Sequence, residues 1–102
     1  MTTIAAPTGT VTVGVDTHMD IHVAAVLDGL GRLLGSAGFD TDPAGNAALI
    51  RWAEQHGTIG QVGVEGTGSY GAEVARDVQQ AGHQVIEVDR PDREAGRARG
   101  EG

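Results

Sequence analysis

Two acidic residues stand where two short β-branched segments end: Asp16 closes residues 10–16 and Glu65 closes residues 60–65. Both segments read as strands, and two carboxylates at neighbouring strand ends form an oxygen-donor half-site for Mg²⁺ or Mn²⁺. Metal-assisted phosphoryl transfer is the chemistry that such a half-site suggests. Spacing alone leaves an alternative open, in which Asp16 caps a turn and Glu65 caps the glycine loop that follows it.

A second pattern repeats at every other position, in Asp16, His18, Asp20 and His22. One continuous strand would place all four on the same face, as a set of transition-metal ligands. A turn expected at residues 17–19 breaks this register. We therefore interpret the histidines and Asp20 as turn and surface residues that help to orient the site from outside it.

Residues 66–71 read Gly-Thr-Gly-Ser-Tyr-Gly, which matches G-x-G-x-x-G between a strand and a helix, with Asp89 about 20 residues further on. A nucleotide-binding module is therefore an alternative function. Glu65 argues against it, because its charge would face a pyrophosphate. We favour a different interpretation of this loop, in which the glycines let the backbone approach a metal-bound phosphate. We expect Thr67, Ser69 and Tyr70 to contact nucleic acid. Two roles are open for the Tyr70 ring: it packs on a nucleotide, or it covers the edge of the core.

The apolar pattern predicts the elements that position these residues, in the order β-β-β-α-β-α-β. The first three strands form an antiparallel meander. A right-handed crossover then places the fourth strand beside the first, so that Asp16 and Glu65 meet. The expected strands are 10–16, 20–27, 32–39, 60–65 and 83–88, and the expected helices are 43–56, capped by Asp42 and stopped by Gly57, and 69–81.

Composition limits the class of protein. The chain has 102 residues, no cysteine and a net charge of -7, which indicates one small domain without disulfides, thiolate nucleophile or Cys-type zinc site. Phe39 and Trp52 are expected in the core. His56 and His83 are expected on the surface, at the ends of helices or strands. The acidic charge requires that any nucleic-acid contact be local or bridged by metal. With no signal peptide or membrane span, we expect a cytoplasmic protein without a membrane partner.

The two ends differ from the domain expected at residues 10–89. Residues 1–9 are rich in Thr, Ala and Pro and predict a disordered leader. Residues 90–102 are charged and Gly-rich, so we expect them to be mobile in the isolated chain. All seven basic residues of the chain are arginines, and four of them lie in this tail, as candidate nucleic-acid contacts: Arg90, Arg93, Arg97 and Arg99.

Several strings together resemble one family. They are Val-Gly-Val-Asp-Thr-His at 13–18, the stretch 62–71 from Val-Gly-Val-Glu to Ser-Tyr-Gly, Ala-Gly-His at 81–83 and Glu-Val-Asp-Arg-Pro at 87–91. In this order they resemble the N-terminal domain of insertion-sequence one-ten transposases, which are related to the pilin-gene DNA invertases. The resemblance covers nearly all of residues 11–100.

The resemblance implies a fold and a function. The fold is α/β and ribonuclease H-like, similar to RuvC, with a five-stranded mixed sheet of order 3-2-1-4-5 flanked by helices. The function is DNA transposition and site-specific recombination through a DEDD set of acids, of which Asp16 matches the first and Glu65 the second. The implied partners are DNA, a guide RNA, and full-length transposase or a second copy.

The last two acids of the set follow the Arg-rich segment in the family, whereas this chain ends at Glu101-Gly102. We therefore expect a truncated domain that holds Mg²⁺ or Mn²⁺ weakly and is inactive alone. Met19, where relatives often have lysine, is a minor departure. A second alternative function is a non-catalytic interaction fragment, or the remnant of a decayed element, that binds transposase or nucleic acid.

Overall fold

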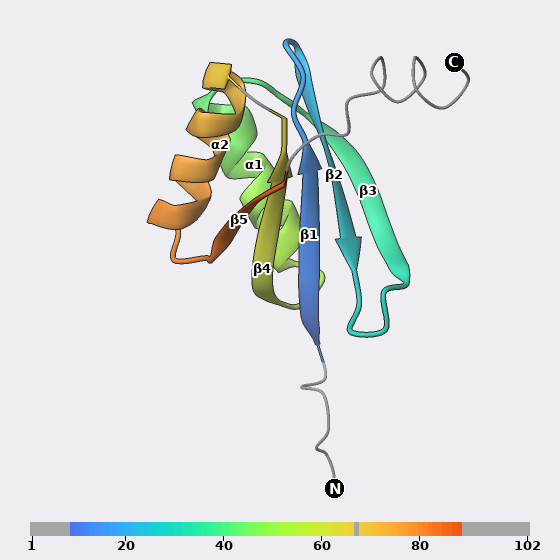
Figure 1. Ribbon diagram of the computed structural model, residues 1–102. Helices are drawn as coiled ribbons and strands as arrows, with labels where there is room; N and C mark the ends of the chain where they lie inside the picture. Colours follow the sequence, from blue (N-terminus) through green and yellow to red (C-terminus); the bar gives the residue numbers. More distant parts are fainter. Residues whose placement is uncertain (1–8, 67, 89–102) are drawn as a thin grey trace, which may run out of the picture.

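A computed structural model describes residues 9–66 and 68–88 as one mixed sheet covered by two helices (Figure 1). The predicted order of elements is confirmed. The elements are β1 (Thr10–Asp16), β2 (Ile21–Leu27), β3 (Leu33–Asp40), α1 (Pro43–Glu54), β4 (Thr58–Glu65), α2 (Gly68–Gln80) and β5 (Val85–Val88).

The sheet has the strand order β3-β2-β1-β4-β5, as the sequence predicts. β2 pairs antiparallel with both β1 and β3, whereas β4 pairs parallel with both β1 and β5. Antiparallel neighbours need only short turns, and the two parallel pairings are made through the crossover helices. The fold is therefore α/β.

Two strands begin two residues away from their predicted starts, and the other strand ends agree with the prediction within one residue. β4 begins at Thr58, two residues early, and the Thr58 amide donates a hydrogen bond to the carbonyl oxygen of Gly9 at 2.6 Å. β5 begins only at Val85, because the amide of His83 donates to the carbonyl of Val78 and so completes the end of α2. The hydrophobic pattern does not show this use of residue 83.

Both helices cover the same face of the sheet (Figure 1). Val11, Val13 and Val15 of β1 are buried on that face, because alternate residues of a strand point to the same side. The helices contribute Leu49, Ala53, Val74, Ala75 and Val78 to the same core. Phe39 and Trp52, which were expected in the core, are partly buried and pack against it with their ring centroids 5.4 Å apart.

The start of α1 follows from its sequence. Asp42 caps the helix by accepting a hydrogen bond from the Gly45 amide at 2.6 Å, and Pro43 occupies the first turn, as predicted. Four residues further on, the buried Asn46 donates from Nδ2 to the Asp77 carboxylate of α2 at 2.9 Å. This contact joins the two helices. Neither helix is long and apolar enough to cross a membrane, as judged over the residues that the structure describes.

Candidate functional site

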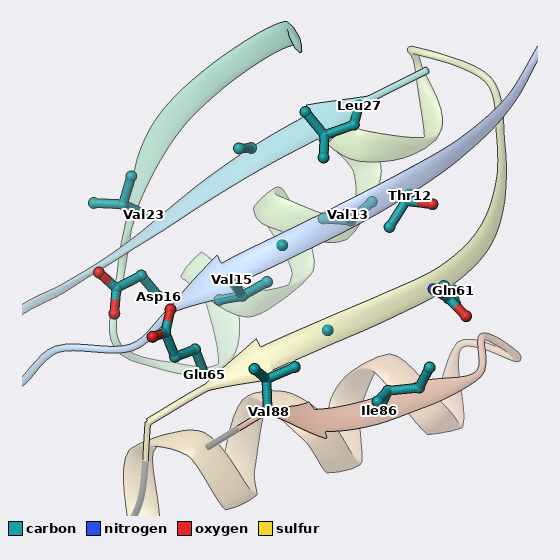
Figure 2. A pocket seen from close by; sticks show the side chains of 13 residues that line it. Thr12, Val13, Val15, Asp16, Val23, Leu27, Gln61, Glu65, Ile86 and Val88 are labelled. Atoms are coloured by element: carbon teal, nitrogen blue, oxygen red, sulfur yellow. The ribbon is translucent and has the colours of Figure 1, made fainter. Parts of the chain in front are cut away.

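Asp16 and Glu65 are paired directly across the parallel strands β1 and β4, of which they are the last residues. Since Asp16 alternates with the buried valines of β1, its side chain lies on the face without helices, and Glu65 lies there too. Figure 2 shows the two carboxylates side by side. The predicted meeting of these residues at neighbouring strand ends is confirmed.

The acid pair lies at one end of a groove of about 470 Å³ on this open face (Figure 2). Val23 of β2 and Val88 of β5 flank the pair, each 45% exposed. The middle of the groove is open, because the paired residues Gly14 and Gly63 lie there and have no side chains. The two carboxylates are therefore accessible from solvent along the sheet.

The loop after β1 contacts both acids. Thr17, which is 5% exposed, donates two hydrogen bonds of 3.0 Å to the carbonyl oxygen of Glu65, one from its amide and one from Oγ1. His18 Nε2 lies 3.1 Å from Asp16 Oδ2. His18 lies between β1 and β2, in the turn that the sequence predicts. Sequence reasoning missed the role of Thr17, because its hydrogen-bond partner lies 48 residues away along the chain.

The donor set fits a hard divalent cation, because both side chains offer carboxylate oxygens. Within residues 9–66 and 68–88, no group of three or more His, Cys, Asp or Glu side chains is placed to hold a metal ion. β1 ends at Asp16 and β2 begins at Ile21, so the series from Asp16 to His22 does not form one strand face. This agrees with the turn predicted between the strands.

His22 is buried, and its expected place at the surface is wrong. The alternation of β2 directs His22 with Ala24 and Val26 toward the helices, where the side chain is 1% exposed. Neither ring nitrogen has a hydrogen-bond partner in the described part of the chain. Burial lowers the pKa of His22, the charge of His18 lowers it further, and Glu73 opposes both effects.

This burial predicts an acid-sensitive fold. Because the pKa of His22 is lower in the folded chain, the unfolded chain binds more protons, and stability from this residue falls as pH drops below about 6.5. We expect His22→Leu to raise the free energy of unfolding by about 1 kcal/mol at neutral pH, since it removes unpaired polar atoms. The gain is larger in acid. Urea unfolding at about pH 7.5 and about pH 5.5 measures both; an unchanged pH slope in His22→Leu would contradict the assignment.

The other two histidines also make contacts that their expected surface positions did not include. The His56 ring packs edge-on against Trp52 with centroids 4.8 Å apart, and its Nδ1 lies 3.0 Å from the Trp52 carbonyl oxygen. His83 Nε2 lies 2.9 Å from Glu54 Oε2, and its side chain is 17% exposed. Both residues are partly buried and serve packing between elements.

The expected nucleic-acid residues are only partly described. Ser69 and Tyr70 are exposed in the first turn of α2, which starts at the same end of the sheet as the acid pair (Figure 1). Beside the glycine loop lies a cavity of about 230 Å³, and Glu87 contributes to its lining. Outside the described residues lie Asp89, the leader at 1–8, and Thr67, Arg90, Arg93, Arg97 and Arg99.

Comparison with known families gives one result that covers most of the chain. The family model of IS110-type DEDD transposases, described as a transposase, matches residues 13–100, a span that includes both Asp16 and Glu65. No curated protein matches the chain. The matched span contains all five strands, apart from the first residues of β1. The observed α/β architecture is consistent with the ribonuclease H-like fold of that family. The chain therefore belongs to the IS110-type DEDD transposase family, whose role is DNA transposition.

Proposed function

We propose that the chain is the N-terminal catalytic-type domain of a DEDD transposase, with Asp16 and Glu65 as two of its four metal-binding acids. The domain acts in DNA transposition and site-specific DNA recombination. One observation carries the proposal: the two acids that match the motif are direct partners at the ends of parallel strands, on the same open face.

The metal is Mg²⁺ or Mn²⁺, held by the carboxylates of Asp16 and Glu65. A bound divalent ion supplies charge stabilisation at a phosphate that undergoes transfer. Two carboxylates leave most of an octahedral shell to other ligands, so the ion is held weakly. Residues 1–102 offer no match to the last two acids of the motif, and we propose that these residues alone do not cleave or join DNA.

DNA is the partner on which the domain acts. The net charge of -7 opposes contact with phosphates, so the proposal requires a local contact or a metal bridge. The contact surface includes Ser69 and Tyr70, which are exposed near the acid pair. We also propose that Thr67 and the arginines of residues 90–99 contact the nucleic acid. Guide RNA and a further transposase chain are the other partners that we propose.

Binding to branched DNA tests the proposal. We expect fluorescence anisotropy to show binding of the purified chain in Mn²⁺ and little binding in EDTA, because the acidic surface needs the ion as a bridge. Asp16→Asn lowers this Mn²⁺-dependent affinity at least about tenfold, since it removes a ligand charge. In the same samples we expect no nicking or joining of branched or linear DNA.

Asp28→Asn is the matched control. It makes the same change in charge at the β2–β3 turn, at the opposite end of the sheet, and its amide oxygen still accepts from the Leu30 amide. We expect this variant to bind as the wild type does. Binding that is equal in EDTA and Mn²⁺ would contradict the metal bridge. Nicking by the intact chain that Asp16→Asn and Glu65→Gln both abolish would contradict the proposed inactivity.

A further inference from the structure

We propose that Thr17 and His18 are positioning residues of the acid pair, Thr17 acting on Glu65 and His18 on Asp16. The inference rests on the proposed function, in which the pair holds a divalent ion. Two consecutive residues of the loop after β1 thereby set the arrangement of both carboxylate-bearing residues. Neither is proposed to touch the ion or the DNA.

Thr17 controls the end of β4. The regular pairing of β1 with β4 stops at Asp16 and Glu65, and the Thr17 amide adds one further bond, to the Glu65 carbonyl. The Thr17 hydroxyl donates to the same oxygen, so both lone pairs of that carbonyl are used. These two bonds fix the peptide plane that follows Glu65, and with it the direction in which the Glu65 side chain leaves the backbone.

Gly66 makes this anchorage necessary. Its φ of +119° lies in the region that favours glycine, so the chain turns out of the sheet directly after Glu65. A strand end followed by a sharp turn receives no further ladder bonds from its own strand. The two bonds from Thr17 therefore hold the last residue of β4 in register with Asp16.

A structural explanation of Thr17 alone is incomplete. Thr17 is buried, and any buried hydroxyl needs a hydrogen-bond partner. Valine would fill the same space without that need, and it has a high preference for strands and their ends. The hydroxyl is instead placed so that the loop directly after Asp16 binds the peptide that follows Glu65. Loss of the hydroxyl would therefore change how Glu65 is held beside Asp16.

His18 restrains the second carboxylate. A carboxylate can only accept, so the bond of 3.1 Å between His18 and Asp16 Oδ2 is donated by Nε2–H. The backbone of His18 is held as well, because its carbonyl accepts from Thr41 Oγ1 at 3.2 Å. His18 thus links Asp16, through its imidazole, to a loop whose backbone is held by Thr41, the residue that follows β3. Hydrogen-bonding groups behind metal ligands change metal affinity by about 10–100-fold.

The test is the Mn²⁺ affinity of the full chain, measured from the electron paramagnetic resonance signal of free Mn²⁺. Thr17→Val keeps the shape and removes the hydroxyl, and we expect it to weaken binding about tenfold. Thr17→Ser keeps the hydroxyl and should bind within about twofold of wild type. His18→Ala should weaken binding about tenfold, whereas His18→Gln, whose amide can still donate, should retain most of the affinity.

Thr12→Val is the control for the threonine change. Thr12 lies on the same strand and the same face as Asp16, four residues before it. Urea unfolding of every variant ensures that affinity is compared between folded chains. If Thr17→Val does not fold, His18→Ala decides, because the His18 side chain is 50% exposed and its removal leaves the core intact.

The outcomes separate this inference from the proposed function. Weaker Mn²⁺ binding by folded Thr17→Val and His18→Ala, with Thr17→Ser, His18→Gln and Thr12→Val close to wild type, supports positioning. Wild-type affinity in either folded variant overturns the inference and leaves the proposed function standing. Wild-type affinity in Asp16→Asn and Glu65→Gln would remove the metal site itself, and both proposals would fall.

Discussion

Replacing Gly45 with alanine is expected to destabilise the domain by at least about 3 kcal/mol, a large part of the stability of a small domain. A Cβ atom at this position would overlap the carbonyl oxygen of Asp40 and lie 2.6 Å from its carbonyl carbon and 2.9 Å from its amide nitrogen. All three atoms belong to the backbone of β3, so no side chain can rotate away. The start of α1 would have to move off the sheet, and the bond from the Gly45 amide to Asp42 would be lost with it.

Urea unfolding of Gly45→Ala beside Gly14→Ala measures this effect. Gly14 lies in the middle of β1 on the open face, and a Cβ there would meet no atom within 4 Å. We expect Gly14→Ala to change stability by less than about 0.5 kcal/mol or to raise it slightly, because glycine weakens a strand interior. Equal stability of the two variants would contradict the close packing of α1 on β3.

The second large effect concerns the acid pair. A ligand that binds only the folded chain stabilises it, and Mn²⁺ at about ten times its dissociation constant should add about 1.4 kcal/mol to the free energy of unfolding. We expect Asp16→Asn and Glu65→Gln each to remove this gain, because each takes away one of two charged ligands. Asp28→Asn should keep the full gain. Urea unfolding with and without Mn²⁺ gives the values, and an equal gain in Asp16→Asn would place the ion elsewhere.

The sheet could be predicted because its signals are local and its topology has few solutions. Alternating β-branched residues mark β1 and β4, and Asp42–Pro43 marks the start of α1. A crossover from a meander to a parallel strand is right-handed, which leaves little choice about the neighbour of β1. The meeting of Asp16 with Glu65 follows from these two facts together.

The missed features depend on contacts between distant segments. His22 follows a turn rich in polar residues, and only the exact start of β2 decides whether it faces solvent or the helices. Gly45 looks unfavourable for a helix until its contact with Asp40 is known. The bonds from Thr17 reach a carbonyl 48 residues away. Residue type and spacing carry no signal for such distances.

The most direct test of the account is a crystal of the 102-residue chain soaked with Mn²⁺ and measured for anomalous scattering. The account predicts a peak between the carboxylates of Asp16 and Glu65, within about 2.5 Å of an oxygen of each, and no such peak in a crystal of Asp16→Asn. An ordered Mn²⁺ bound elsewhere, with the acid pair showing none at the same concentration, would contradict the shared metal site.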